Sequence, residues 1–523
     1  MPHKILFVTS EVLPLIKTGG LGDVSSSLPA ALTELDHDVR ILMPAYKQVL
    51  DKLERRSDLN RQQRERRHEK RAVHLSNRPY KAKVITQFVW NNMQINLLET
   101  TLPGTDIKLY LIDYPYLYYR PGTPYQDEMG HDWNDNAWRF HLLCRIAADI
   151  ATAKLNLNWL PDVLHANDWP SALSCALLKN DINRPATVFT IHNLAHRGLF
   201  SEQTFYDLSL EPSLWTLHEL EFHGQLSFMK GGLVFADRVN TVSPTYAQEI
   251  QTGENGFGMD DLLRHRKDRL SGILNGIDTN EWNPKTDSMI TKNYSINSLK
   301  DKQQNKSALL EYFKMPEILD NEGKSVILFG LVARLTGQKG IDLLLNALPE
   351  FINKPIQMVI LGSGDAWLES QLQNWADQYP EKIGLFTGYD EALSHQIEAG
   401  SDAFLMPSHF EPCGLNQLYS LRYGTIPIVN NVGGLADTVV SAIAENLANK
   451  TATGIKFDHN KGGTLNQAID QALLLYQQPE VWEQMIKTAM RQEFTWQQSA
   501  REYVKLYELA IVDRDESITT YAE

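Results

Sequence analysis

Short runs of apolar residues alternate with stretches of helical periodicity along most of the chain. The runs cover residues 5–8, 39–42, 162–165, 187–190, 326–333 and 357–361. Several of them end in polar or glycine-bearing turns, which is typical of short buried strands. Because strands that alternate with helices form parallel sheets covered by helices on both faces, the pattern predicts a doubly wound α/β fold.

The series of strands and turns starts afresh near Val326, after a polar, helix-prone stretch at residues 297–311. A chain of 523 residues also exceeds the size at which a single core stops growing. We therefore expect two Rossmann-like domains that face each other across a cleft, at residues 1–272 and 273–495. An amphipathic stripe in the last segment predicts a helix over residues 496–512 that packs back on one domain, followed by a frayed tail at 513–523.

The first apolar run leads into the sequence Lys17-Thr18-Gly19-Gly20-Leu21-Gly22-Asp23 and then a helix-compatible stretch. Glycines let a backbone approach a ligand closely, and the first amides of a helix attract anions. This loop predicts a pocket for phosphate, although glycine loops at such turns also serve geometry alone. It matches neither the P-loop nor the dinucleotide fingerprint, because the lysine precedes the glycines and the glycine spacing differs.

A second strand ends in a loop that carries Arg334 and Lys339, and a third turn places Glu411 just before a helix near residue 418. Arginine offers a fork for phosphate oxygens and lysine a compact charge, so the two cations predict an anion site. Glu411 accepts a sugar hydroxyl in one interpretation. In the other, it complements the helix dipole.

The formal net charge of −14 argues against nonspecific binding to nucleic acid or to an anionic membrane, because both need an excess of Lys and Arg. The three cysteines, Cys144, Cys175 and Cys413, are too few and too scattered for a disulfide framework. No apolar run reaches membrane-spanning length. We therefore expect a cytoplasmic protein. The basic stretch 55–71 predicts a solvated surface, with an acidic partner as the alternative.

An ordered set of motifs spread over residues 4–510 resembles the bacterial glycogen synthase and plant starch synthase family. The motifs lie at residues 4–23, 135–140, 163–169, 241–246, 274–278, 334–340, 411–418 and 433–438. The resemblance implies a retaining glucosyltransferase of GT-B architecture. Its partners would be ADP-glucose or UDP-glucose as donor and the nonreducing end of an α-1,4-glucan as acceptor.

The resemblance also assigns roles to residues of this chain. Catalytic roles fall to Lys17, Asp135, His165, Arg334, Lys339 and Glu411. Substrate contacts fall to Gly19, Gly20, Asp23, Asn275, Gly388, Tyr389, Cys413, Gly414, Leu415 and Asn416. In this scheme the loop of Lys17 meets the phosphates or the glucose, whereas Arg334 and Lys339 hold the diphosphate from the other domain.

His165 would contact the donor glucose, with a satisfied structural histidine as the alternative. Asp135 would lie near the reacting carbon, Asn275 would line the cleft, and Gly388 with Tyr389 would flank the base. Glu411 and the amides of Cys413 and Gly414 would hold glucose hydroxyls, while the amides of Leu415 and Asn416 would meet phosphate. Fixed cations suffice in principle to stabilise a departing diphosphate, so we expect no cofactor and no required metal.

Several alternatives remain at this point. The family's relatives often carry a second glutamate eight residues after the first, where this chain has Tyr419, so we assign no ribose contact. Cys413 is better explained as a small packed residue than as a nucleophile. A glucan phosphorylase, an inactive glucan-binding protein on a transferase fold and a nicotinamide dehydrogenase are the competing functions. The base of the donor, the acceptor length and the oligomeric state are not readable from the sequence.

Overall fold

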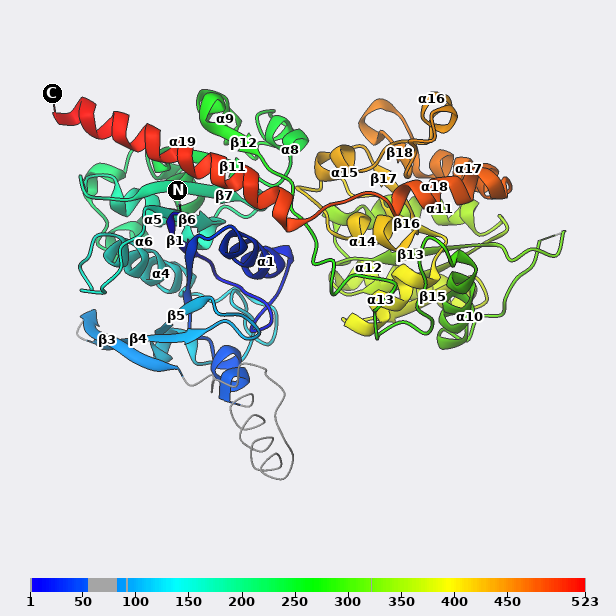
Figure 1. Cartoon of the computed structure of the whole chain (residues 1–523), viewed down its shortest axis with the longest axis horizontal. Helices are drawn as coiled ribbons and strands as arrows, with labels where there is room; N and C mark the ends of the chain where they lie inside the picture. The colour runs from blue at the N-terminus through cyan, green and yellow to red at the C-terminus, as the bar shows by residue number, and fades with distance from the viewer. Residues whose placement is uncertain (1, 55–81, 91–92, 321, 523) are drawn as a thin grey trace. The chain divides into compact units, whose positions relative to one another are not determined.

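The computed structural model describes residues 2–54, 82–90, 93–320 and 322–522, and the predicted basic stretch 55–71 lies outside them. The described chain divides into two compact units (Figure 1). The first contains residues 1–242, 250–273 and 496–523, and the second contains residues 243–249 and 274–495. The division at Ile273 falls next to the expected position, whereas the grouping of segment 243–249 with the second unit was not anticipated from the sequence.

The first unit is built on a nine-stranded sheet with the order β12-β11-β7-β6-β1-β2-β5-β4-β3. Its strands are β1 (Lys4–Val8), β2 (Asp38–Pro44), β3 (Lys83–Trp90), β4 (Met93–Thr101), β5 (Lys108–Asp113), β6 (Val163–Asn167), β7 (Ala186–Ile191), β11 (Arg238–Thr241) and β12 (Leu270–Gly272). Seven of them run parallel, but β4 pairs antiparallel with both β3 and β5. The sheet is therefore mixed, where the sequence pattern predicted a parallel one.

Helices and a small antiparallel sheet complete the first unit. The helices are α1 (Gly20–Glu34), α3 (Pro115–Tyr118), α4 (Asn136–Ala151), α5 (Trp169–Leu178), α6 (Glu202–Asp207), α7 (Phe228–Phe235), α9 (Asp260–His265) and α19 (Trp496–Ala522). The small sheet has the order β8 (Leu199–Ser201), β10 (Gln225–Ser227), β9 (Glu221–Phe222). Strands β1, β6 and β7 are buried nearly throughout, because helices cover both faces of the sheet at its centre.

The second unit is built on a six-stranded parallel sheet with the order β15-β14-β13-β16-β17-β18. The strands are β13 (Ile327–Val332), β14 (Ile356–Gly362), β15 (Ile383–Thr387), β16 (Ala403–Met406), β17 (Ile426–Asn430) and β18 (Ile455–Phe457). Ile327, Phe329 and Leu331 of β13 enter one apolar cluster, whereas Leu328 enters a second. Since successive side chains of a strand point to opposite faces, both faces of this sheet are buried, as the sequence predicted.

Ten α-helices belong to the described part of the second unit. They are α8 (Pro244–Glu249), α10 (Lys302–Tyr312), α11 (Ile341–Phe351), α12 (Ala366–Gln378), α13 (Glu391–Gly400), α14 (Asn416–Tyr423), α15 (Gly433–Thr438), α16 (Ala444–Ala448), α17 (Leu465–Tyr476) and α18 (Pro479–Ala489). Helix α8 lies in segment 243–249, which groups with this unit. Helix α11 buries Ile341, Leu344 and Leu348, an i, i+3, i+7 stripe that predicts its apolar face. Helix α17 starts with a capping box made by Thr464 and Gln467.

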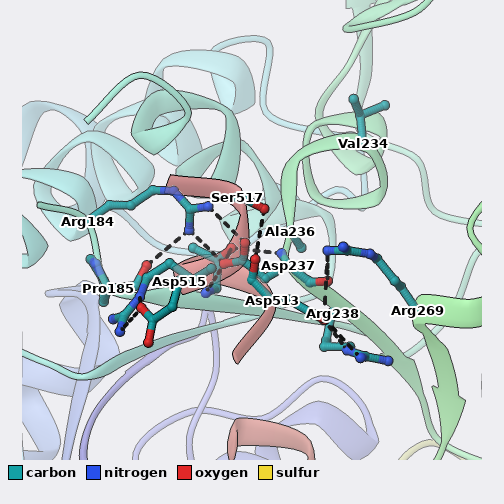
Figure 2. A network of polar contacts seen from close by, with 12 residues as sticks. Arg184, Pro185, Val234, Ala236, Asp237, Arg238, Arg269, Asp513, Asp515 and Ser517 are labelled. Carbon is teal, nitrogen blue, oxygen red and sulfur yellow. Dashed lines mark hydrogen bonds and ion pairs between the residues drawn. The ribbon is translucent and has the colours of Figure 1, made fainter. Parts of the chain in front are cut away.

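The C-terminal helix α19 packs on the first unit, against α1, β7 and β11 (Figure 1). It continues to Ala522, so the expected frayed tail at 513–523 is wrong up to that residue. Asp513 is 7% exposed and forms ion pairs with Arg238 and Arg269, which Figure 2 shows at close range. A buried carboxylate held by two guanidinium groups fixes the helix where the sequence indicated only a polar end.

Next to this contact, Asp237 joins two segments of the first unit. Its carboxylate accepts two hydrogen bonds from the Arg184 guanidinium, at 2.6 and 2.8 Å (Figure 2), and two from the Thr187 backbone amide and hydroxyl, at 2.7 and 2.8 Å. Both side chains of the ion pair are nearly buried. The pair therefore links the end of α7 to the start of β7.

We expect Asp237→Ala to lower the free energy of unfolding of the first unit by about 3–5 kcal/mol, because it leaves the Arg184 charge buried and unpaired. Urea unfolding followed by circular dichroism measures the change. Asp261→Ala is the matched control, since Asp261 pairs with Arg264 at the surface and its loss should change little. Equal stabilities of the Asp237→Ala variant and the wild type would contradict this role.

A second buried charge pair lies in the second unit, where His395 donates from Nδ1 to Asp287 at 2.7 Å. Burial lowers the pKa of His395, but the hydrogen bonds and charges of Asp287 and Glu391 outweigh burial and raise that pKa from 6.5 to about 9. A group whose pKa is raised on folding stabilises the folded protein fully below its unfolded pKa and loses that effect as pH rises through its folded pKa. The pair therefore stabilises the unit most below pH 6.5.

We expect the free energy of unfolding of the second unit to fall between about pH 6.5 and pH 9 as His395 loses its proton. In Asp287→Asn, which keeps a hydrogen-bond acceptor but removes the charge, this dependence on pH should be much weaker. Denaturation midpoints at a series of pH values measure both slopes. Identical slopes in the variant and the wild type would show that the pair does not carry the dependence.

Candidate active site

The loop between β13 and α11 carries the two cations that the sequence singled out. Arg334 is exposed and, within the described part of the chain, its side chain makes no hydrogen bond or ion pair. Lys339 ends a short 3₁₀ turn, Gly337–Lys339, at the carboxyl edge of the parallel sheet. Ligands of open α/β sheets bind at this edge. The loop therefore presents a guanidinium group that is available to an anion.

Lys339 and Glu411 come together from two different loops of the second unit. The lysine Nζ donates to Glu411 Oε2 at 2.6 Å, and the Ser408 hydroxyl donates to the same oxygen at 3.0 Å. Glu411 is 5% exposed, so its charge needs this partner. Both hydrogen bonds go to Oε2, and Oε1 has no partner among the described residues. The carboxylate can therefore accept a ligand hydroxyl while it holds the lysine in place.

Glycines allow the loops of this site to pack backbone against backbone. A Cβ atom on Gly340 would collide with the carbonyl oxygen of Pro407, and one on Gly433 with the carbonyl oxygen of Glu411. Both glycines also have a positive φ, 68° and 43°, which other residues rarely adopt. Gly434 donates its N–H to the Glu411 carbonyl at 3.1 Å. The position of Glu411 thus depends on these glycines as well as on Lys339.

Cys413 lies in the turn between Glu411 and α14, and it is buried. Burial raises the pKa of its thiol to about 12, which leaves the sulfur a poor nucleophile at neutral pH. The backbone of Asn275 hydrogen-bonds this thiol, so the sequence-predicted Asn275 lies against the same turn. The buried Asn275 Oδ1 has no partner among the described residues. The packing role expected for Cys413 agrees with this environment.

Helix α14 starts next to this turn, with Leu415 as its N-cap and Asn416 as its first residue. The Asn416 side chain donates to the Val332 carbonyl at 2.6 Å, which ties the helix start to the end of β13. No side chain caps the helix. Its first amides therefore remain available to an anion at the same sheet edge as Arg334.

The remaining residues predicted in the second unit lie after β15. Gly388 has a φ of 142° and donates its N–H to the Gly362 carbonyl at 3.0 Å. Tyr389 follows it with 74% of its surface exposed, and its hydroxyl hydrogen-bonds Glu391. An exposed ring on a sheet-edge loop can stack on a planar base. The contact itself remains a prediction.

Tyr419, which stands where related enzymes carry a second glutamate, belongs to an aromatic stack. Its ring lies 3.7 Å from that of Trp282, and His395 covers the other face of Trp282 at 3.8 Å. The described residues also contain one cluster spaced for a metal, Glu281, Glu391 and His395. His395 Nδ1 donates to Asp287 at 2.7 Å, and its Nε2 lies 3.8 Å from Glu391 Oε1, so the ring takes part in an ion-pair network of the unit.

In the first unit, the glycine loop is held by Glu11, a residue that the sequence analysis did not assign to the site. Glu11 accepts hydrogen bonds from the amides of Thr18 and Gly19, from the Thr18 hydroxyl at 2.6 Å and from the Tyr125 hydroxyl at 2.6 Å. It is 2% exposed. The amide of Gly19 therefore donates to a carboxylate of the chain itself, and its contact with the phosphates or the glucose stays a prediction.

The rest of the loop differs from Gly19. Gly20 begins α1, so its N–H has no partner within the helix. Lys17 donates to Asp23 at 2.9 Å, and both side chains are partly exposed. Since the pair is short-range and partly solvated, a ligand anion can compete with Asp23 for the lysine. Lys17 and Gly20 are the members of this loop that remain suited to an anionic ligand.

Asp135 is the N-cap of α4, and its Oδ2 accepts from the Arg120 guanidinium. Arg120 in turn stacks on Trp133, with its Cζ atom 4.5 Å from the ring centroid. Among the described residues, Asp135 Oδ1 has no hydrogen-bond partner. The carboxylate is thus oriented through Oδ2, and Oδ1 can accept a hydrogen bond from a ligand hydroxyl.

His165 is packed inside the first unit. It is fully buried on β6, with Nδ1 hydrogen-bonded to the Tyr507 hydroxyl at 2.9 Å and Nε2 to the Thr190 hydroxyl at 2.8 Å. Burial, with the neighbouring His192, lowers its pKa to about 3, so the ring is neutral. With both nitrogens occupied beneath α19, the geometry contradicts the predicted contact with donor glucose and favours the structural alternative.

The predicted residues thus form two sets, each described within its own unit. The second unit brings together Arg334, Lys339, Glu411, Asn275 and the start of α14 at one sheet edge. The first unit brings together Lys17, Asp23 and Gly20 with the unassigned Glu11. No helix among the described residues is long and apolar enough to span a membrane.

Comparisons with known proteins find relatives that match nearly the whole chain. Residues 4–265 match the starch synthase catalytic domain, and residues 313–491 match the glycosyl transferases group 1 family. Glycogen synthase 1 of Methylococcus capsulatus is 50% identical over 97% of each chain, and glycogen synthase of Thioalkalivibrio sulfidiphilus is 48% identical over 96% of this chain and 99% of its own.

A solved structure also resembles the chain over nearly its whole length. The catalytic domain of starch synthase IV from Arabidopsis thaliana, bound to ADP and acarbose, has a TM-score of 0.82 and 27% identity, and covers 98% of this chain and 100% of its own. Two Rossmann-like units with these relatives define a GT-B glycosyltransferase. The chain belongs to the glycogen synthase and starch synthase family of glycosyltransferases.

Proposed function

We propose that this protein is a retaining glucosyltransferase that elongates an α-1,4-glucan at its nonreducing end, using ADP-glucose or UDP-glucose as donor. The observation that carries the proposal is the sheet edge of the second unit, where Arg334, the Lys339–Glu411 pair and the open start of α14 converge. The names of the relatives support glycogen as the acceptor. The ADP in the starch synthase IV structure supports ADP-glucose as the first donor to test.

In this proposal, the two cations stabilise the nucleoside diphosphate as it leaves. Transfer breaks the bond between the glucose C1 and the diphosphate oxygen, and that oxygen keeps the electron pair. Arg334, Lys339 and the first amides of α14 would stabilise the negative charge that develops there, which lowers the barrier more than it lowers the energy of the bound donor. We infer that these groups do the work without a required metal.

In this proposal, the carboxylate of Glu411 binds the glucose. Glu411 Oε1 would accept a glucose hydroxyl, while Oε2 keeps Lys339 aimed at the phosphate. The acceptor hydroxyl oxygen forms the new bond to C1 on the face that the diphosphate leaves, and its proton passes to a departing phosphate oxygen. Configuration is then retained without a covalent enzyme intermediate, and Glu411 is not required as a nucleophile.

The other predicted residues take supporting parts in this proposal. Asp135 Oδ1 would receive an acceptor hydroxyl, and Tyr389 would stack on the base. Lys17 and Gly20 would approach the donor from the first unit. Three buried free cysteines, Cys144, Cys175 and Cys413, fit a reaction that takes place in a reducing cytoplasm.

We expect Arg334→Ala and Lys339→Ala each to lower kcat/KM for the donor by about 100-fold, because each removes a charge-assisted contact to the diphosphate worth about 3 kcal/mol. The assay measures nucleoside diphosphate released from ADP-glucose, UDP-glucose and other sugar donors, with glycogen as acceptor. Lys324→Ala, on an exposed turn of the same unit, is the control. Wild-type turnover in both variants would exclude the cation clamp, and an inactive wild type with every donor would exclude the function.

We also expect Glu11→Ala to lower kcat/KM about 10-fold to 100-fold, because the Thr18 and Gly19 amides lose their buried acceptor and the loop of Lys17 loses its shape. Glu11→Gln keeps an acceptor oxygen and should retain more activity than Glu11→Ala. Steady-state kinetics of both variants, with thermal melting as a check on folding, measure the effect. If Glu11→Ala turns over like the wild type, the loop does not depend on this carboxylate.

A further inference from the structure

Two short helices of the second unit pack against each other, and neither has an assigned role. Helix α8 belongs to segment 243–249, which follows β11 in the sequence but groups with the second unit. Helix α15 begins at Gly433, the glycine whose backbone packs against the carbonyl oxygen of Glu411. The pair of helices therefore borders the turn that carries Glu411.

The two helices hydrogen-bond each other through carboxylates at opposite ends. Glu249, the last residue of α8, accepts a hydrogen bond from the Gly433 amide at the start of α15, at 2.9 Å. Asp437, near the end of α15, accepts from the Thr245 amide at 3.0 Å and from the Thr245 hydroxyl at 2.6 Å. The first amides of a helix have no partner within it, so each carboxylate satisfies an amide of the other helix. We call these four residues the helix clasp.

Helix α15 is packed directly against the turn of Glu411. A Cβ atom on Gly434 would collide with the carbonyl oxygen of Cys413, as one on Gly433 would collide with that of Glu411. The Gly434 amide also donates to the Glu411 carbonyl at 3.1 Å. Because closely packed backbones transmit a displacement to their neighbours, a shift of α15 would move Glu411.

The far end of α15 supports the start of α14 in the same way. The buried Thr438 hydroxyl accepts a hydrogen bond from the side-chain amide of Gln417, which is also buried, at 3.2 Å. The same amide group donates to the carbonyls of Cys413 and Gly414, at 3.0 and 2.9 Å. Helix α15 thus supports the whole segment from Glu411 to the first turn of α14.

The two ends of the helix clasp differ in burial. The hydrogen bond between Gly433 and Glu249 is partly buried, whereas both hydrogen bonds to Asp437 are exposed. A hydrogen bond to a charged group contributes more to stability where water is partly excluded than at an exposed surface. Loss of the Glu249 carboxylate should therefore displace α15 more than loss of the Asp437 carboxylate.

We propose that Glu249 is a positioning residue of the donor site, which holds α15 against the turn of Glu411 through the Gly433 amide, and that Asp437 supports the same contact from the other end of α15. The inference rests on the proposed function, because it takes Glu411 as the residue that binds the donor glucose. Glu249 touches no reacting atom in this proposal. It acts through Glu411 and, by way of the ion pair of Glu411, on Lys339.

Steady-state kinetics separate positioning from a general loss of structure. We expect Glu249→Ala to raise KM for the nucleotide sugar about 10-fold and to leave KM for glycogen within about 2-fold, because Glu411 contacts the donor. Glu249→Gln keeps an acceptor oxygen for the Gly433 amide and should stay within about 3-fold of the wild type. Partial unfolding would instead lower kcat and leave both KM values unchanged.

Two further variants complete the kinetic comparison. Asp437→Ala should raise KM for the nucleotide sugar about 3-fold, because it removes the exposed end of the helix clasp. Glu483→Ala is the matched control, since Glu483 is an exposed carboxylate on α18 of the same unit and pairs with Lys487. It should change neither KM.

Binding of ADP in a second background tests whether Glu249 acts through Glu411. We expect Glu249→Ala to weaken calorimetric binding of ADP about 5-fold in the wild-type background and less than about 2-fold in Glu411→Gln, where Lys339 has already lost its charged partner. Thermal melting shows that each variant folds. If Glu249→Ala does not fold, Asp437→Ala takes its place in both measurements.

The negative results have different meanings. If the wild type releases no nucleoside diphosphate from any donor, the proposed function fails and this inference fails with it. If the wild type is active and the folded Glu249→Ala variant keeps the wild-type KM for the nucleotide sugar, the inference is overturned, while the proposed function stands. The inference is also overturned if Glu249→Gln is impaired as much as Glu249→Ala, or if Glu249→Ala weakens ADP binding equally in both backgrounds.

Discussion

The close packing of three backbone segments at one sheet edge is the constraint on which the candidate donor site depends. Gly340, Gly433 and Gly434 leave no room for a Cβ atom, and they bring the loop of Lys339 against the turn of Glu411. Only then can one lysine and one buried carboxylate pair at 2.6 Å while Arg334 stays exposed beside them. The glycines of this site thus position its charged side chains.

In the first unit, a carboxylate of the chain itself holds the loop that follows β1. There the loop amides of Thr18 and Gly19 are held by the chain's own Glu11. Carboxylates disfavour phosphate but suit sugar hydroxyls. In the proposed function, Arg334 and Lys339 hold the diphosphate, and Glu411 accepts a hydroxyl group of the sugar.

The sequence predicted the parts of the fold and site that follow from local pattern. The buried strand before Arg334, the turn that carries Glu411 in front of a helix and the second doubly wound sheet all leave such a signal, and the observed elements agree with them. It missed what depends on distant partners. Glu11 meets Tyr125 across 114 positions, and His165 lies beneath Tyr507 across 342. A strand-end pattern does not say which histidine a helix will cover, so the contact assigned to His165 was wrong.

We propose above that Arg334 and Lys339 hold the phosphate that is bonded to glucose in the donor and is terminal in ADP, and calorimetric binding of ADP and AMP tests this most directly. ADP carries that phosphate and AMP lacks it. The account predicts that the wild type binds ADP about 100-fold more tightly than AMP, and that this ratio falls toward one when both cations are replaced by alanine. If the double variant keeps the wild-type ratio of ADP to AMP affinity, the two cations do not hold the diphosphate and the account is contradicted.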